Sequence, residues 1–131
     1  MASMRVFIAS PDDRFRLAMM VFVDKEPGLI VAGMSDRLTG LPAQLEGSQP
    51  DVVLEDWIFP SRLKADLFVD LQSLKHRPRT VVFASRPEEK GQILEAGADY
   101  FIAKDAPPDN VMSILTGISA SKTNAGVNWE N

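Results

Sequence analysis

Four polar residues of types that take part in phosphoryl chemistry each follow a short apolar run in the sequence. They are Ser10, Asp56, Ser85 and Lys104. A carboxylate such as that of Asp56 can act as the nucleophile toward a phosphoryl group, while a hydroxyl and an ammonium group hold the phosphoryl oxygens. Each of these residue types is common near loops, so the prediction of an aspartyl phosphate depends on their joint placement.

Asp56 closes the apolar run at the centre of the stretch from residue 50 to residue 60. Residues 52–54 are Val-Val-Leu, and Glu55 and Asp56 follow them. Short Val- and Leu-rich runs bounded by turn residues are typical of buried strands in parallel sheets. Successive strand residues face opposite sides of a sheet, so Glu55 is not expected to share a site with Asp56. Trp57 is expected to pack over the sheet edge.

Four further apolar runs predict strands at residues 5–9, 29–33, 80–84 and 100–103. Between and after the strands, apolar spacings of three and four, together with proline and glycine boundaries, predict helices. Five helices are expected. Four of them lie between residues 12 and 26, from about 42 to 47, from 87 to 96, and from about 107 to 118. The fifth, which follows Pro60, contains Leu63, Leu67, Leu71 and Leu74.

Strand and helix alternate five times, which predicts an α/β domain with a doubly wound, five-stranded parallel sheet flanked by five helices. The carboxyl ends of parallel strands meet at one edge of such a sheet, where ligands bind. The four polar residues should therefore converge there. The domain is expected to span residues 4–119, and residues 120–131 are expected to form a polar linker or tail.

The composition excludes several kinds of site. The chain has 131 residues, no cysteine and a single histidine, His76. Disulfides and thiolate metal sites are therefore excluded, and a histidine-based zinc site is not expected.

The net charge of −4 argues against nucleic-acid binding through this domain. No apolar run reaches the length of a membrane span and no secretory leader is recognisable, so a cytoplasmic protein without membrane contact is expected.

Two stretches of the chain resemble the receiver domains of bacterial two-component response regulators. The first is Pro50-Asp51-Val52-Val53-Leu54-Glu55-Asp56, with Pro60 four residues beyond, and the second is Glu95-Ala96-Gly97-Ala98-Asp99-Tyr100-Phe101-Ile102-Ala103-Lys104. The resemblance covers about residues 5–118 and implies the flavodoxin-like receiver fold. The continuation Lys104-Asp105-Ala106 is similar to that of regulators with a helix-turn-helix output.

The resemblance implies a role for each residue of the site. Asp56 matches the phosphoacceptor, which a sensor histidine kinase phosphorylates and which also ligates Mg²⁺. Ser85 matches the Thr or Ser that moves to bond the phosphoryl group, Lys104 the phosphate-binding lysine, and Phe101 the aromatic residue that moves with this switch. The same resemblance implies a homodimer through the surface of residues 86–118, which holds the fourth helix, fifth strand and fifth helix.

The chain departs from the family at the metal site. The resemblance places Ser10 and Pro11 where the family has a pair of acidic residues that hold Mg²⁺. Magnesium prefers carboxylate oxygens in octahedral geometry, and neither residue supplies one. Asp12 is a remote alternative ligand, but Asp12 and Asp13 fit better as the cap and first turn of the following helix.

Three functions follow from these observations. The missing acids favour an atypical receiver, not an enzyme, that signals through protein contacts with weak or absent Mg²⁺-dependent phosphorylation of Asp56. The alternative is a normally phosphorylated receiver that controls a helix-turn-helix transcriptional output. A small nucleotide-binding α/β enzyme is less favoured, because the stretch Ser10-Pro11-Asp12-Asp13 has no glycine with which to cradle a phosphate.

Overall fold

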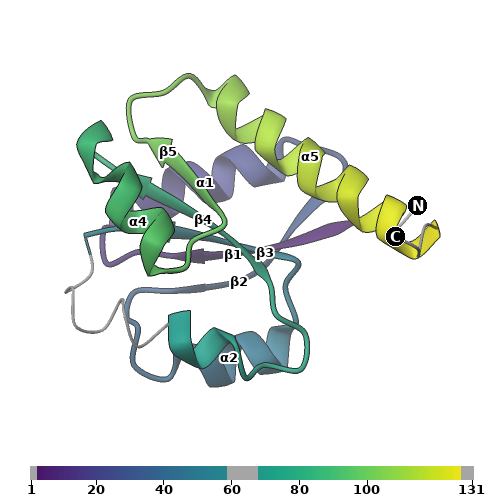
Figure 1. Ribbon diagram of the computed structural model, residues 1–131. Helices are drawn as coiled ribbons and strands as arrows, with labels where there is room; N and C mark the ends of the chain where they lie inside the picture. Colours follow the sequence, from purple (N-terminus) through teal and green to yellow (C-terminus); the bar gives the residue numbers. More distant parts are fainter. Residues whose placement is uncertain (1–2, 59–67, 128–131) are drawn as a thin grey trace.

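The computed structural model describes residues 3–58 and 68–127, and its centre is one five-stranded sheet (Figure 1). The strands are β1 (Met4–Ala9), β2 (Leu29–Ser35), β3 (Val52–Asp56), β4 (Arg79–Ala84) and β5 (Tyr100–Ala103). Their spatial order is β2-β1-β3-β4-β5, and every neighbouring pair is parallel. The predicted five-stranded parallel sheet is therefore confirmed.

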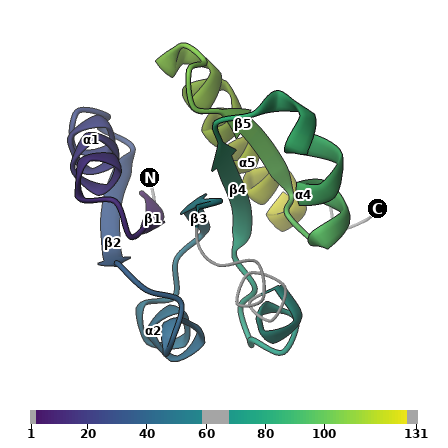
Figure 2. The ribbon, with the colours of Figure 1, turned by 90° about the vertical axis from the view of Figure 1, so that its left-hand side faces the viewer.

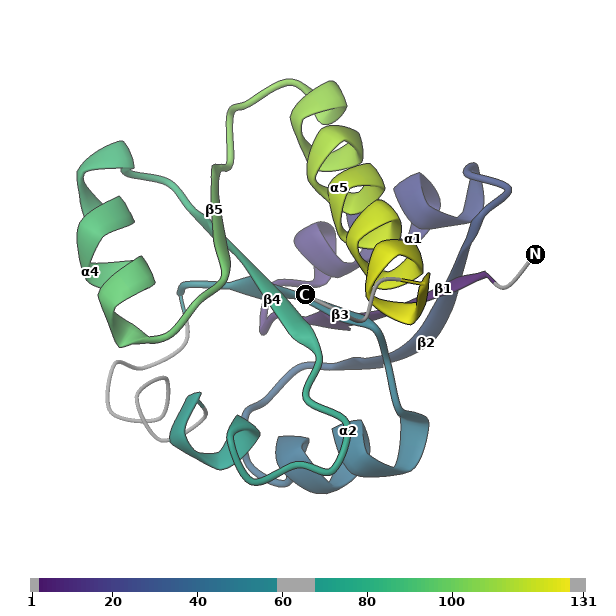
Figure 3. The ribbon, with the colours of Figure 1, turned by 45° about the vertical axis from the view of Figure 1, so that its right-hand side comes forward.

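Helices cover both faces of this sheet. They are α1 (Asp13–Asp24), α2 (Leu41–Ser48), α4 (Lys90–Ala96) and α5 (Pro108–Val127), and residues 68–71 are also helical. In Figures 1 and 3, α1 and α5 lie on one side of the sheet and α2 lies on the other. Figure 2 looks along the sheet and shows the segment after residue 67 beside α2. This is the doubly wound arrangement that the sequence predicts.

The strands alternate their side chains between two apolar cores, one on each face. The core under α1 and α5 includes Val6, Ile8, Leu54, Val81, Phe83 and Ile102 from the strands. The core under α2 and α4 includes Phe7, Ala9, Val53, Val82 and Ala84. Each Val or Leu side chain buried completely in this way stabilises the fold by roughly 1.5–3 kcal/mol. The two cores fix the strand register, and the register fixes which residues reach the carboxyl edge.

Local sequence signals account for several element boundaries. Asp12 caps α1 through its side chain, and a proline stands in the first turn of α2. Gly97, with a φ of 127°, ends α4, and a Cβ at this position would lie 3.1 Å from the Cβ of Phe68. A side chain at residue 97 would therefore be both strained and crowded.

Some boundaries differ from the sequence prediction. Strand β2 runs two residues beyond Gly33, to Ser35. The fourth helix begins with a 3₁₀ turn, Pro87–Glu89, before α4. Helix α5 extends to Val127, so the first part of the expected linker, residues 120–127, continues this helix. In the predicted leucine helix, Leu71 is helical and buried, but Leu74 lies beyond the end of the helix, because residues 72 and 73 form a turn. Leu63, Leu67 and Pro60 lie outside the described residues.

Across residues 3–58 and 68–127, we find no helix with the length and apolar character needed to cross a membrane.

Candidate functional site

The carboxylate of Asp56 ends strand β3 and is fully buried. Its Oδ2 atom accepts a 2.7 Å hydrogen bond from the hydroxyl of Ser10. Its Oδ1 atom lies 2.7 Å from the Nζ atom of Lys104 and accepts a 3.2 Å hydrogen bond from the backbone N–H of Ile58. Both carboxylate oxygens therefore have protein partners, and one ammonium group balances the negative charge.

Ser10 connects Asp56 to the beginning of α1. It follows β1 directly, and its side chain is fully buried. While its hydroxyl donates to Asp56, its Oγ atom accepts a 3.0 Å hydrogen bond from the backbone N–H of Asp12. The Asp12 carboxylate in turn accepts a 2.9 Å hydrogen bond from the backbone N–H of Arg14. Asp12 is therefore the helix cap, as predicted, and Asp13 begins the first turn.

Lys104 reaches Asp56 from the end of β5. Its backbone N–H donates to the carbonyl of Ala84 at 2.9 Å, which extends the pairing of β4 and β5 by one residue. Its Nζ atom lies 5.4 Å from the centroid of the Phe15 ring. Phe15 packs edge-on against Phe83, with 5.2 Å between the ring centroids. The lysine is thus held between a carboxylate and the face of an aromatic ring, which attracts a cation.

Ser85 and Phe101 are not among the described hydrogen-bond and ion-pair partners of the Asp56 carboxylate. Ser85 follows β4 at an exposed position, and within the described ranges no hydrogen bond joins its side chain to Asp56. Phe101 is half-buried and packs against the core under α2 and α4. Of the four strand-end residues, the structure brings Ser10, Asp56 and Lys104 together. The switch roles of Ser85 and Phe101 stay predictions.

The neighbours of Asp56 in the chain belong to the opposite face of the sheet. Trp57 is buried in the core under α2 and α4, which also contains Val53. Glu55 is fully buried, and strand alternation places it on this face with them. Trp57 therefore packs at the edge of the sheet as expected, and Glu55 and Asp56 do not form a carboxylate pair.

The groups around Asp56 do not fit a Mg²⁺ ion. Magnesium takes an octahedral set of oxygen ligands that usually includes carboxylates and water. The partners of Asp56 here are an ammonium, a hydroxyl and an amide, all of which donate hydrogen bonds. Pro11 has no side-chain ligand to offer, and Asp12 is committed to capping α1. No cluster of three or more Asp, Glu, His or Cys side chains suited to a metal occurs in the part of the chain that the structure describes.

Sequence reasoning missed three contributors to this site. Phe15 belongs to the helix predicted between residues 12 and 26, but its contact with Lys104 depends on how α1 packs. The backbone N–H of Ile58 carries no side-chain signal at all. The guanidinium group of Arg16 donates a 2.6 Å hydrogen bond to the carbonyl of Ser10 and also pairs with Asp13. A basic residue six positions after a strand-end serine is too common to indicate such a contact.

Comparison with solved structures identifies the fold. The receiver domain of the putative response regulator NarL from Mycobacterium tuberculosis matches with a TM-score of 0.78 and 21% identity, over 91% of this chain and 98% of that one. The response regulator RcsB from Salmonella typhimurium matches with a TM-score of 0.79 and 16% identity, over 92% of this chain and 61% of that one. A chain from the complex of the CheA3 P1 domain with CheY6 from R. sphaeroides matches with a TM-score of 0.77 and 18% identity, over 92% of this chain and 99% of that one.

The chain therefore has the receiver fold of response regulators, as the sequence resemblance implies. No protein-family model and no curated protein matches the sequence.

Proposed function

We propose that this chain is an atypical receiver domain of a two-component signalling system. Asp56 occupies the phosphoacceptor position, and its Mg²⁺-dependent phosphorylation is weak or absent. The domain signals through contacts with other proteins and is not itself an enzyme. The receiver fold and the contact between Asp56 and Lys104 support the assignment to this class of protein.

The observation that carries this proposal is the full burial of the Asp56 carboxylate with hydrogen-bond donors on both oxygens. A carboxylate that attacks phosphorus needs one oxygen free to approach in line with the leaving group. Here the Ser10 hydroxyl takes Oδ2, while Lys104 and the Ile58 amide take Oδ1. Attack would require the breaking of at least one of these hydrogen bonds and the opening of a covered site.

The presence of Ser10 and Pro11 in place of the expected acidic pair adds to this barrier. In phosphoryl transfer the metal neutralises the negative charge on the transferred group. At this site one carboxylate, Asp56, faces one cation, Lys104. A divalent cation would therefore be placed close to an ammonium group with little negative charge to offset the repulsion. We expect Mg²⁺ affinity to be low for this reason.

The alternative is a normally phosphorylated receiver that controls a helix-turn-helix output. The contact between Asp56 and Lys104 favours it, because an ammonium group next to the nucleophile would also hold a phosphoryl oxygen. In that case Ser85 and Phe101 form the switch. The matched RcsB structure is described in terms of DNA interaction, and this chain spans 61% of it. A DNA-binding output would therefore belong to a segment outside the matched part.

The partners that we propose are signalling proteins. The match to a chain from a complex between a CheA3 P1 domain and CheY6 supports a sensor histidine kinase or a related protein as the partner. A homodimer through residues 86–118 stays a prediction; Leu94 on α4 is the exposed large apolar residue within that range. A cytoplasmic location and the absence of nucleic-acid contacts through this domain belong to the same proposal.

The test is the mass of the intact protein after incubation with acetyl phosphate and Mg²⁺. The proposal predicts no phosphorylated species, or only a trace, under conditions that phosphorylate a typical receiver assayed in parallel. An Asp56→Asn variant is the control, because it removes the nucleophile and keeps the shape of the side chain. A substantial mass gain in the unmodified chain that this variant abolishes would establish the alternative.

A further inference from the structure

We propose that a hollow beside Lys104, between α1 and the beginning of α5, binds a small aromatic carboxylate. The hollow has a volume of about 480 Å³ and adjoins the ends of β4 and β5. Volumes of 300–1,000 Å³ are typical of sites for small organic ligands. Lys104 lines this hollow and Asp56 does not, so the site is distinct from the covered carboxylate of Asp56.

Small side chains leave the space open. Ala18 on α1, Ala103 at the end of β5 and Ala106 in the loop before α5 all line the hollow. Larger residues at these three positions would fill it. Helix α5 begins at Pro108, which also lines the hollow and marks the point where the chain turns away from β5.

The walls of the hollow are apolar and partly aromatic. Phe15, Phe22 and Phe83 contribute rings, and Met19, Ile102 and Val111 contribute aliphatic or thioether groups. Aromatic side chains favour offset or edge-on contacts with another ring, which adds to the gain from burying its surface. Methionine adapts its shape to the group that it contacts. An aromatic body therefore suits these walls better than a polar one.

Two cationic residues and one carboxylate are among the described residues that line the hollow, and this balance favours an anion. Arg14 and Lys104 line the hollow together with Asp12. The Asp12 carboxylate is engaged by the backbone N–H of Arg14, and the Lys104 ammonium is balanced by Asp56. No ion pair involves the guanidinium group of Arg14 within residues 3–58 and 68–120. An anionic ligand would pair with this guanidinium group, which binds carboxylates through two parallel hydrogen bonds.

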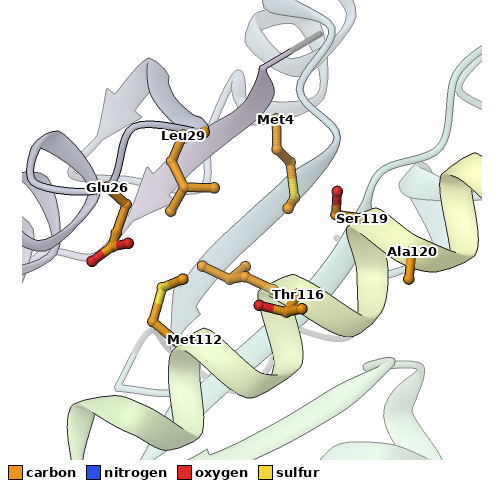
Figure 4. Close-up of a pocket in the computed structure, with 9 residues that line it drawn as sticks. Met4, Glu26, Leu29, Met112, Thr116, Ser119 and Ala120 are labelled. Atoms are coloured by element: carbon orange, nitrogen blue, oxygen red, sulfur yellow. The ribbon is translucent and has the colours of Figure 1, made fainter. Parts of the chain in front are cut away.

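A second hollow in the same molecule has a different charge and serves as a comparison for ligand binding. It has a volume of about 330 Å³ and lies at the opposite end of β1, between the beginning of β2 and α5 (Figure 4). Met4, Leu29 and Met112 make it apolar, and Glu26 is the one charged residue among the described residues that line it. An aromatic carboxylate would be repelled there, so the two hollows should differ in their preference for charge.

The experiment compares 1-naphthoate with its neutral analogue 1-naphthamide by calorimetry and by amide NMR shifts of the whole chain. We expect saturable binding of naphthoate, with the largest shifts at Ala18, Ala106 and Val111. Naphthamide should bind about tenfold more weakly, which is the difference expected between a charge-assisted and a neutral hydrogen bond. Equal affinity for the two compounds, or no saturable binding of naphthoate, would overturn the proposal.

Two variants locate the site. Ala18→Leu should fill the hollow and abolish binding, whereas Val21→Leu, at an exposed position of the same helix, should leave binding unchanged. Arg14→Gln should weaken naphthoate binding and leave naphthamide binding unaltered. Arg86→Gln serves as its control, because Arg86 is exposed and does not line the hollow. Arg14 is exposed, so this second variant is informative even if Ala18→Leu fails to fold. Binding of naphthoate that neither Ala18→Leu nor Arg14→Gln affects would place the site elsewhere and refute the assignment.

Discussion

Ser10 and Asp56 lie 46 positions apart in the chain, and a 2.7 Å hydrogen bond joins their fully buried side chains. The resemblance to receiver domains places Ser10 where an acidic metal ligand is expected. A hydroxyl at this position donates a hydrogen bond to the central carboxylate, whereas a carboxylate would repel it. A serine at this position therefore leaves a site in which, among the described residues, Lys104 balances the Asp56 carboxylate and residue 10 adds no second carboxylate.

The first prediction concerns the Ser10 hydroxyl. Ser10→Ala should lower the free energy of unfolding by about 1–3 kcal/mol, because a buried carboxylate oxygen loses its donor. Urea denaturation measures this change. Ser85→Ala removes a hydroxyl from an exposed position and should stay within about 0.5 kcal/mol of the parent. Equal losses in the two variants would show that the hydrogen bond between Ser10 and Asp56 contributes no more than a surface contact.

Lys104 should contribute more to stability than Ser10. Lys104→Met leaves the buried Asp56 carboxylate without its cation, and breaking a buried ion pair in this way costs about 3 kcal/mol or more. The Lys104 side chain is 23% exposed, which places the expected loss at the lower end of the range. The control is Lys90→Met on the exposed side of α4, which should have little effect on the urea midpoint. A loss of less than about 1 kcal/mol, the value typical of a surface ion pair, would contradict the buried contact.

Two glycines should respond in opposite directions to alanine. A Cβ at Gly33 would lie 2.8 Å from Cε2 of Phe7, so Gly33→Ala should destabilise the domain by roughly 1–3 kcal/mol through overpacking. A Cβ at Gly91 would have no atom within 4 Å, and Gly91 lies within α4. Gly91→Ala should therefore stabilise the domain by up to about 1 kcal/mol, because alanine favours the helix. Thermal unfolding of both variants tests the packing of β2 on β1 and the presence of α4.

The ion pair at the end of β2 predicts a pH effect. A hydrogen bond from Arg37, together with its charge, lowers the pKa of Asp36 below the ordinary value of 3.8. A carboxyl group whose pKa is depressed by folding stabilises the native state above its unfolded pKa, and this contribution is lost as the pH falls through the folded pKa. Arg37→Gln should raise the pKa of Asp36, which an NMR titration of the carboxyl carbon below pH 5 would measure. An unchanged titration curve would rule out the pair in solution.

Much of the fold follows from periodicity. All five strands were predicted within two residues, because parallel strands buried on both faces form short apolar runs. Where an observed boundary differs from the predicted one, contacts with other parts of the chain determine it. Strand β2 continues to Ser35 because Met34 and Ser35 pair with Ile8 and Ala9, which no local signal in residues 33–35 indicates. The extension of α5 to Val127 likewise lies in a polar segment without the apolar spacing that marks residues 111–118.

The sequence predicts which strand-end residues form the site. It does not predict all of the contacts that these residues make. Asp56 and Lys104 were expected to meet, and they do. Ser10 was expected only to replace a metal ligand, and its hydrogen bond to Asp56 depends on a rotamer that the sequence does not specify. The exposed position of Ser85 depends on the path of the chain between β4 and the 3₁₀ turn, which local residue types do not determine.

An acidic residue at position 10 gives the positive control for the claim that Ser10 prevents Mg²⁺ binding. Ser10→Asp places a second carboxylate beside Asp56, which should destabilise the domain without metal and create a Mg²⁺ site of two carboxylates. We expect Mg²⁺ at millimolar concentrations to raise the melting temperature of this variant and to leave that of the unmodified chain unchanged. The same effect of Mg²⁺ on both chains would mean that Ser10 does not control the metal site.

The most direct measurement is a Mg²⁺ titration monitored by the fluorescence of Trp57, which follows Asp56 in the chain and is buried. A Trp129→Phe background leaves Trp57 as the single tryptophan. If the site is balanced by Ser10 and Lys104, Mg²⁺ at millimolar concentrations should give no saturable change in the unmodified Ser10 chain and a saturable change in Ser10→Asp. A saturable response in the unmodified chain that Asp56→Asn abolishes would contradict the account and establish a metal-binding receiver.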